Sequence, residues 1–183
     1  MTHGPVVLAL TCVLAAAGCT SRPRAPALHA ESVYQDESEG FRFEPPRGWN
    51  MTVRSAFPAG QPVTQQRKLV EYKFANPVNP ASLTVSRLDT TEAIDLLAHF
   101  AAKATGPDAW RPVKPVSTVT IDGMPGQTVS LASGVGTKAQ IMDITAFQRN
   151  GRHYFFMLLC HPDDRSAREA GRRAIATLNW KAG

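Results

Sequence analysis

The most reactive side chains of the sequence lie near its C-terminus, where Cys160 and His161 are adjacent. A cysteine beside a histidine suggests a thiol paired with an imidazole. In a strand, however, neighbouring residues point to opposite faces of the sheet, which separates the two groups. Cys160 instead alternates with large apolar residues: Tyr154, Phe156 and Leu158. We therefore expect Cys160 to be a small buried side chain of the core rather than a nucleophile.

The run HPDD (161–164) places an imidazole next to two carboxylates, and Asp143 could complete a metal site. No repeated His or Cys spacing supports one, so we expect neither a metal ion nor another cofactor. Carboxylates at the start of a helix have a simpler use, because they accept hydrogen bonds from free backbone amides and interact favourably with the helix dipole. We expect Asp163, or Ser166 with Glu169, to cap the final helix.

The other histidines, His29, His99 and His153, have no nucleophile and acid close to them in the sequence. The motifs GxSxG and HExxH and a phosphate-binding glycine loop are all absent from it. We therefore expect no enzyme activity. Distant residues can still assemble a catalytic site, so a hydrolase remains an alternative.

Cys19 suggests a different chemistry. An almost wholly apolar run over 6–17 is too short, at about twelve residues, for a bilayer core that needs roughly twenty, so an export signal is the better interpretation. The small residues before the cysteine, Ala16, Ala17 and Gly18, resemble the lipobox of bacterial lipoproteins. That resemblance implies that Cys19 becomes the first residue of the mature chain and carries a lipid. In the alternative, an ordinary signal is cut nearby and Cys19 is a plain thiol.

These features divide the chain into a signal peptide over 1–18, a flexible tether over 19–37 and one domain over 38–183. The tether is rich in Pro, Ser and Ala, which is typical of an extended linker. The lipid would hold the protein to a membrane of the cell envelope, facing the periplasm or the exterior, and in a Gram-negative host to the outer membrane. Once the signal is removed and Cys19 acylated, only Cys160 is left, so a core and not a disulfide must stabilise the domain.

Part of the formal charge of +5 lies in arginines near both ends of the chain. Arg22 and Arg24 follow Cys19 closely, where anionic head groups would attract them. Four more lie on the polar side of an amphipathic helix expected after HPDD: Arg165, Arg168, Arg172 and Arg173. No aromatic residues are interleaved with these cations, so we expect no nucleic-acid partner.

Gly and Pro separate short segments in which apolar and polar residues alternate, which predicts antiparallel strands. Hairpins are expected around DGMPG and around RNGR, where Asn150 and Gly151 suit a two-residue turn. A third hairpin should join KLVEYKF (68–74) to SLTVSRL (82–88). Before it, GFRFEP and WNMTVRS read as strands on either side of a turn, with Trp49 covering the core.

Two helices are expected between and after these strands. Asp89 and Glu92 have the spacing of a capping pair, which predicts a helix over Thr91–Ala104 followed by a loop over 105–115. The second helix follows HPDD. Strand pairs with a helix between them and a helix at the end indicate an α+β fold with an antiparallel sheet.

Several of these segments resemble the PsbP-like superfamily, which includes PsbP, Mog-type and DcrB-like proteins. The resemblance begins at GFRFEPPRGW and continues through EYKF, LTVSRL, TIDGMPGQTV and ITAFQRNGRHYFFMLLC to a final helix ending in IATLNW. It covers about residues 38–181. It implies an antiparallel sheet sandwiched by helices, in a family whose known members bind or assemble other proteins and carry no catalytic motif. Fold alone does not identify the partner.

Trp110 and Arg111 lie between prolines in GPDAWRPVKP, and both residue types are over-represented at binding hot spots. A Trp is also often a lid over a core, so this loop is a candidate contact surface only if it is exposed. Together these features predict a lipid-anchored envelope protein that acts as a non-catalytic adaptor or accessory binding subunit, with another envelope protein as partner. The alternative is a small-ligand-binding lipoprotein, which requires a concave apolar pocket.

Overall fold

The computed structural model describes residues 33–55, 57, 62–76, 78–101 and 109–181. The signal peptide, Cys19 and most of the tether expected from the sequence lie outside these ranges.

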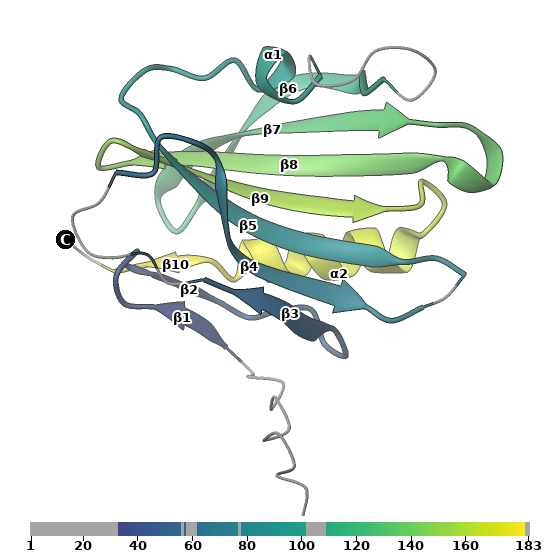
Figure 1. Ribbon diagram of the computed structural model, residues 1–183, viewed down its shortest axis with the longest axis horizontal. Coiled ribbons are helices and arrows are strands. Elements are labelled where there is room, and N and C mark those ends of the chain that lie inside the picture. Colours follow the sequence, from purple (N-terminus) through teal and green to yellow (C-terminus); the bar gives the residue numbers. More distant parts are fainter. Residues whose placement is uncertain (1–32, 56, 58–61, 77, 102–108, 182–183) are drawn as a thin grey trace, which may run out of the picture.

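Within the described residues the chain forms two antiparallel sheets and two helices (Figure 1). The small sheet has the order β1-β2-β10, with β1 (Tyr34–Asp36), β2 (Phe41–Phe43) and β10 (Asn179–Trp180). The large sheet has the order β3-β4-β5-β9-β8-β7-β6, with β3 (Asn50–Arg54), β4 (Arg67–Phe74), β5 (Ala81–Asp89), β6 (Arg111–Ile121), β7 (Met124–Ser133), β8 (Gln140–Arg149) and β9 (Arg152–Cys160). The helices are α1 (Leu96–Ala101) and α2 (Arg165–Ala176), and a 3-10 turn, η1 (Gly136–Lys138), precedes β8.

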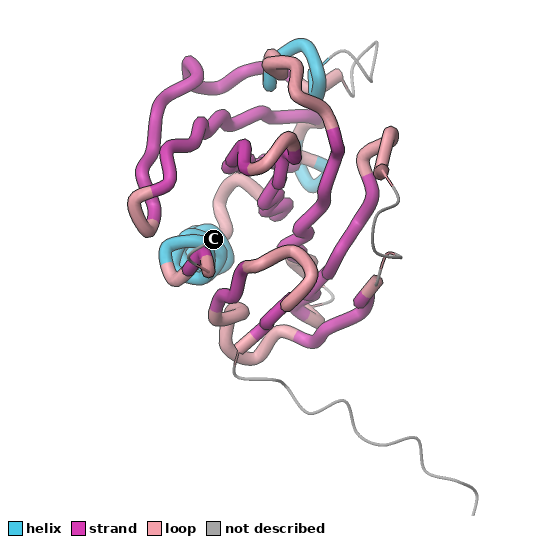
Figure 2. Tube along the Cα trace, turned by 90° about the vertical axis from the view of Figure 1, so that its left-hand side faces the viewer, coloured by secondary structure: helices cyan, strands magenta, loops and turns pink. Residues whose placement is uncertain are grey.

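The two faces of the large sheet are covered by different elements. α2 and the small sheet lie on one face, and α1 packs on the other (Figures 1 and 2). Consecutive residues of β9 show the division, because Phe156 packs in the apolar cluster with α2 while Phe155 packs in the cluster with α1. The fold is therefore the expected α+β arrangement, with an antiparallel sheet between helices.

Residues of β9 that face α2 confirm the alternation read from the sequence. Tyr154, Phe156, Leu158 and Cys160 are each 2 % exposed or less. Cys160 is thus a buried core side chain, as predicted.

Two hairpins close through two-residue turns. Asn150 and Gly151 join β8 to β9 with φ angles of 51° and 70°, and Asp122 and Gly123 join β6 to β7 with 51° and 73°. Positive φ at both central residues is the geometry that fits the twist of antiparallel strands, and it favours Asn-Gly and Asp-Gly. The first turn was predicted in place, and the second is shorter than the DGMPG segment suggested.

The helix expected over Thr91–Ala104 is wrong at its start. α1 begins at Leu96, and the Oδ1 atom of Asp95 accepts hydrogen bonds from the backbone N–H groups of Leu97 and Ala98. Asp89 cannot cap this helix because it remains in β5 and binds Arg87. Residues 102–104 of the expected helix lie outside the described ranges.

Three further boundaries differ from the expectation. Tyr34–Asp36, assigned to the tether, pair with β2, and the side chain of Tyr34 is fully buried, so the domain begins before residue 38. Arg111, assigned to a loop, starts β6, an edge strand in which prolines cost no hydrogen bond on the solvent side. The N-cap of α2 is Asp164, neither Asp163 nor Ser166, and its side chain accepts from the N–H of Ala167.

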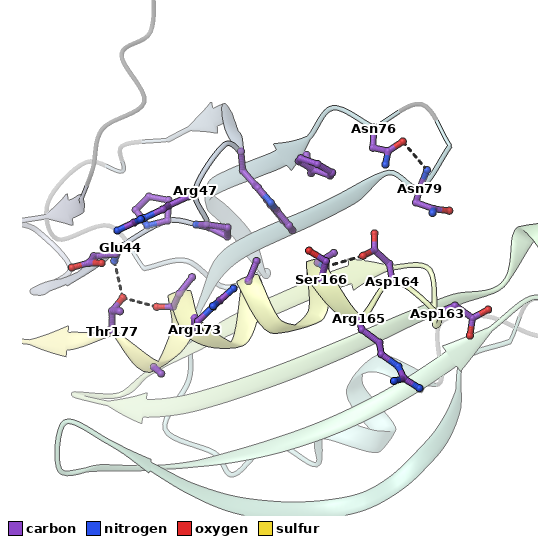
Figure 3. Close-up of a pocket in the computed structure, with 18 residues that line it drawn as sticks. Glu44, Arg47, Asn76, Asn79, Asp163, Asp164, Arg165, Ser166, Arg173 and Thr177 are labelled. Atoms are coloured by element: carbon purple, nitrogen blue, oxygen red, sulfur yellow. Dashed lines mark hydrogen bonds between the residues drawn. The ribbon is translucent and has the colours of Figure 1, made fainter.

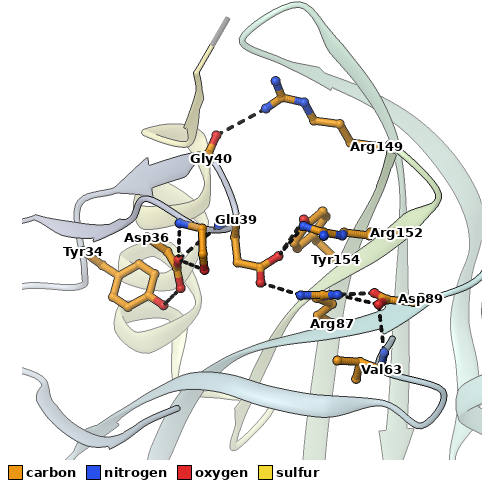
Figure 4. Close-up of polar contacts among 11 residues, drawn as sticks. Tyr34, Asp36, Glu39, Gly40, Val63, Arg87, Asp89, Arg149, Arg152 and Tyr154 are labelled. Carbon is orange, nitrogen blue, oxygen red and sulfur yellow. Dashed lines mark hydrogen bonds and ion pairs between the residues drawn. The ribbon is translucent and has the colours of Figure 1, made fainter. Parts of the chain in front are cut away.

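A buried ionic network fastens the small sheet to the large one (Figure 4). Its centre is Glu39, in the β1–β2 turn, whose side chain is 2 % exposed. Arg87 of β5 donates to one carboxylate oxygen at 2.6 Å, and the hydroxyl of Tyr154 of β9 donates to the other at 2.9 Å. Arg152 reaches the second oxygen at 3.3 Å. One turn of the small sheet is therefore held by the two central strands of the large sheet.

Asp89 neutralises the other side of the Arg87 guanidinium and extends the network. The carboxylate of Asp89 binds this guanidinium and also accepts the N–H of Val63 at 2.8 Å. Hydrogen bonds from Arg87 lower the pKa of Asp89 despite the opposing effect of burial. Burial raises the pKa of Tyr154, with the charge of Glu39 adding to the effect, so its phenol stays protonated and donates.

Replacing Glu39 with Ala should lower the free energy of unfolding by about 3 kcal/mol or more, because Arg87 loses one of its two carboxylate partners and the buried hydroxyl of Tyr154 loses its acceptor. Glu37, in the same turn, forms an exposed ion pair with Lys181, so Glu37→Ala should cost at most about 1 kcal/mol. Urea unfolding of the two variants measures both values. Equal losses would show that the network does not hold the sheets together.

Candidate functional site

Among the residues that the structure describes, the reactive side chains singled out in the sequence do not meet in a catalytic arrangement. Burial raises the pKa of the Cys160 thiol to about 11, and the charge of Asp143 adds to the effect, so the thiol stays protonated near neutral pH. His161 lies next to it in the chain, but its Nε2 atom is 3.4 Å from the carbonyl oxygen of Gly136. The adjacency in the sequence therefore produces no thiol–imidazole pair.

The histidines on the α1 side of the sheet also have structural partners. The Nε2 atom of His99 lies 2.9 Å from Oε1 of Gln66, whose amide donates to Ser86 Oγ at 2.8 Å. Gln66 thus lies between the serine and the imidazole in this chain of hydrogen bonds. His153 donates from Nε2 to the carbonyl oxygen of Glu92 at 3.0 Å, and burial lowers its pKa.

The carboxylate of Asp143 binds donors of the protein itself. It accepts hydrogen bonds from Ser130 at 2.5 Å, from Arg168 at 3.2 Å and from Arg172 at 3.3 Å. Over the ranges that the structure describes, no group of three or more His, Cys, Asp or Glu side chains could hold a metal ion. The arginines of α2 are therefore only partly solvated, since two of the four expected on its polar face bind this carboxylate.

Trp110 and Arg111 are separated in their surroundings. Trp110 is half-buried and packs against the apolar cluster under α1, which agrees with a lid over the core. Arg111 is exposed at the start of β6. Of the two residues predicted to form a contact surface, only Arg111 is exposed. The residues of the loop before Ala109 lie outside the described ranges.

A groove of about 1220 Å³ runs along α2, between this helix and two loops (Figure 3). The β2–β3 loop lines one part and the end of β4 with the loop to β5 lines another, while α2 and its preceding turn form the remaining side. These residues are Glu44, Pro45, Pro46, Arg47, Trp49, Phe74, Asn76, Asn79, Asp163–Ala167, Ala170, Arg173, Ala174, Ala176 and Thr177. Three segments that are distant in the sequence therefore make one concave surface.

The apolar part of the groove combines small and aromatic side chains. Ala167, Ala170 and Ala174 follow one another about one turn apart on α2, and their short side chains leave the space open. Trp49 and Phe74 stack at 6.1 Å between ring centroids with an angle of 27° between the planes. Trp49 is 4 % exposed, whereas Phe74 is 38 % exposed and lines the groove.

Hydrogen bonds hold both loops in place. The N–H of Trp49 donates to the carbonyl oxygen of Pro46 at 3.2 Å, and Gly48 supplies the positive φ of 77° that this turn needs. The N–H of Glu44 donates to Thr177 Oγ1 at 2.8 Å, which joins this loop to the end of α2. In the other loop, Oδ1 of Asn76 accepts from the N–H of Val78 at 2.9 Å. Hydrogen bonds within the chain thus fix parts of both walls of the groove.

Charges of both signs line the groove in equal number. The acidic side chains are Glu44, Asp163 and Asp164, and the basic ones are Arg47, Arg165 and Arg173. An occupant therefore needs no large net charge. The sequence marked Trp49 as a core residue and PRGW as a turn, and no local signal placed either beside α2.

Where the chain can be described, no helix has the length and apolar character that a membrane crossing requires. Cys19 lies outside the described ranges, so its lipidation stays a prediction.

Comparison with known proteins supports the fold through structure alone. No protein-family model matches the chain, and no curated protein matches it in sequence. Cyanobacterial PsbP (CyanoP) from Synechocystis sp. PCC 6803 superposes with a TM-score of 0.57 at 14 % identity, covering 86 % of this chain and 97 % of that one. PA94, a protein of unknown function from Pseudomonas aeruginosa, gives 0.51 at 15 % identity over 82 % and 97 % of the two chains.

A third solved structure is LpqN, which is involved in cell envelope biogenesis of Mycobacterium tuberculosis. Its TM-score is 0.47 at 13 % identity, covering 78 % of this chain and 83 % of that one. The likeness to CyanoP and PA94 extends over nearly their whole length. With the strand order and the two covered faces described above, the fold of this chain is that of a PsbP-like domain.

Proposed function

We propose that this chain is a lipid-anchored, non-catalytic accessory protein of the cell envelope, and that the groove along α2 binds an extended segment of another envelope protein. The observation that carries the proposal is the shape of the groove. It follows α2, a helix of twelve residues, which at 1.5 Å per residue is about 18 Å long. An extended chain advances about 3.3 Å per residue, so five or six residues fit along it.

The lining of the groove favours a polypeptide over a small apolar molecule. The exposed ring of Phe74, stacked on Trp49, is the kind of aromatic surface on which proline-containing extended segments dock. Asn76 and Asn79 lie at the rim, and amide side chains of this kind can hydrogen-bond to a peptide backbone. Arg47 and Arg165 form no ion pair within the part of the chain described, so their guanidinium groups are available to an acceptor.

The tether allows a lipid-anchored domain to reach its partner. Residues 20–33 separate Cys19 from β1, and fourteen residues can span at most about 50 Å when fully extended. The small apolar residues before Cys19 and the proline-rich segment after it support an anchored domain that moves on a flexible chain.

Filling the groove should abolish partner binding. Ala170→Trp places a large ring in the groove, whereas Glu169→Trp places the same ring on the neighbouring, exposed position of α2 outside it. In a cross-linked pull-down of the full-length protein from its native envelope, we expect one partner in near-equal amount with the wild type and with Glu169→Trp. Ala170→Trp should reduce it at least about ten-fold, which corresponds to about 1.4 kcal/mol. Unfolding temperatures of both variants verify that they are folded.

The same pull-down with Trp110 and Arg111 both replaced by Ala separates the two candidate surfaces. Since Trp110 packs on the core and only Arg111 is exposed, this variant should retain the partner. A partner that is lost with the double variant and kept by Ala170→Trp would overturn the groove and assign binding to the β6 edge.

Cys19→Ser should prevent acylation. The variant should lack the mass of the lipid and should leave the membrane fraction, because one polar side chain replaces the only proposed anchor. Fractionation and intact-mass measurement test this, with Cys160→Ser as a control that should stay in the membrane. Retention of Cys19→Ser in the membrane with an unchanged mass would contradict the anchor.

A non-catalytic Cys160 should also be chemically silent in the folded protein. With its pKa at about 11 and its side chain 2 % exposed, a disulfide reagent at pH 8 should modify the chain and its Cys160→Ser variant to the same extent. In denaturant the chain should show one more reactive thiol than the variant. Rapid modification of Cys160 in the native state would reopen a role as nucleophile.

A further inference from the structure

A second cavity, of about 320 Å³, lies on the other side of α2, between this helix and β6, β7 and β8. Its walls carry more polar than apolar side chains, unlike the core beside it. The lining comprises Lys114, Pro115, Ser117, Thr128, Val129, Ser130, Asp143, Thr145, Leu158, Arg172 and Ile175.

The strand register explains why polar groups gather there. Lys114 pairs with Ser130, Ser130 with Asp143, and Asp143 with Leu158, so these residues form one row across four strands. A second row runs from Ser117 through Thr128 and Thr145 to Phe156. Paired residues share a face of the sheet. Each row is therefore apolar at β9 and polar on β8, β7 and β6.

The position of α2 explains why each row is apolar at β9 and polar on the strands beyond it. The helix packs directly on β9, since a Cβ atom added to Gly171 would lie 2.7 Å from the side chain of Leu158. Strands are about 4.8 Å apart, so β7 and β6 lie roughly 10 and 14 Å to the side of β9. A helix with its side chains has a radius of only about 5 Å. The helix therefore covers β9 and leaves the polar ends of the rows open.

Bulges in β6 bring its side chains over this opening. The pairing of β6 with β7 shifts between Pro112 and Lys114 and again between Lys114 and Ser117, which inserts extra residues on the edge strand. Bulges bend a strand and redirect its side chains, and they are frequent beside binding sites. Here Lys114, Pro115 and Ser117 become part of the pocket wall.

The side chains that line the pocket carry more positive than negative charge, and the carboxylate of Asp143 does not occupy all of their hydrogen-bond donors. Lys114 and Arg172 line it, and Arg168 reaches the same carboxylate of Asp143 from α2. Asp143 already accepts from Ser130 and from both arginines, so it does not select a cation. Lys114 forms no ion pair with another described residue. In the lining of the pocket, the single carboxylate of Asp143 is thus accompanied by the cations of Lys114 and Arg172.

We propose that this pocket binds the phosphate group of a small polyol ester, such as a glycerol phosphate unit. The phosphate carries only acceptors and negative charge, which match the ammonium group of Lys114 and the guanidinium group of Arg172. The hydroxyl groups of Ser117, Thr128 and Thr145 can donate to and accept from the polyol. The volume is near the lower end for ligand pockets and suits a head group rather than a large molecule.

This site is separate from the groove, because the groove is lined by Ala167, Ala170 and Ala174 and the pocket by Arg172 and Ile175. The ligand can be a free ester or the head group of a lipid, and the two sources share the same chemistry. A test therefore needs a soluble probe of each kind.

Calorimetric titration of the full-length protein in nonionic detergent, with glycerol 1-phosphate and with dihexanoyl phosphatidylglycerol below its micelle concentration, tests the proposal. Two matched probes serve as controls: glycerol lacks the phosphate, and dihexanoyl phosphatidylcholine keeps the phosphate but carries choline in place of the free glycerol head group. Lys114→Gln should weaken binding about ten-fold or more because it removes a charge-assisted hydrogen bond. Lys114→Arg should restore most of the affinity.

Arg111→Gln is the control variant, because it removes the same charge from an exposed position of the same strand that does not line the pocket. It should change the affinity less than about two-fold. Saturable binding of either phosphate probe that depends on Lys114 and not on Arg111 supports the site, and the better probe identifies the source. Absence of saturable binding, or equal weakening by both variants, would overturn it.

Discussion

The carboxylate of Glu39 is the buried charge on which the arrangement of the two sheets depends. A charge that has left water needs donors on both oxygens, and here they come from Arg87 and Tyr154, on the adjacent central strands β5 and β9. The position of the β1–β2 turn places the carboxylate within hydrogen-bond distance of both donors. The next segment of the chain is β2 and its loop to β3, so the network that seats the small sheet also places one wall of the groove.

Aromatic packing also holds the small sheet against the large one. Phe41 of β2 contacts Tyr154, Phe156 and Trp180 edge to face, with ring centroids 5.4 to 5.9 Å apart. Trp180 belongs to β10, which follows α2 and pairs with β2, so the end of the helix is tied back to the same small sheet. The hydrogen bond from Glu44 to Thr177 adds a third tie. As a result, α2 and the β2–β3 loop keep a fixed spacing, and a groove between them persists.

What could be predicted from the sequence were the features that local rules decide. The turn at Asn150 and Gly151 needs positive φ angles, which these residue types favour, so the hairpin could be predicted. The alternation of apolar residues that ends at Cys160 marks a buried face, so the burial of the thiol could be predicted too. Asp89 was misassigned because its partner, Arg87, is buried by strands that pair at long range. The groove joins three segments, around Trp49, Phe74 and Ala170, and the pocket joins four strands to a helix, so no local pattern marks either.

The geometry of one helix on a seven-stranded sheet accounts for both surfaces. α2 spans about two strands, while the sheet face is several times wider, so its flanks must be covered by something else or be polar. On the β4 and β5 side the small sheet provides the cover, and the groove lies where that cover meets the helix. On the β6 to β8 side none of the described helices or strands covers the sheet beyond α2, and the side chains there carry hydroxyl, amine and carboxylate groups. An occupant of either site would contact the same helix, from opposite sides.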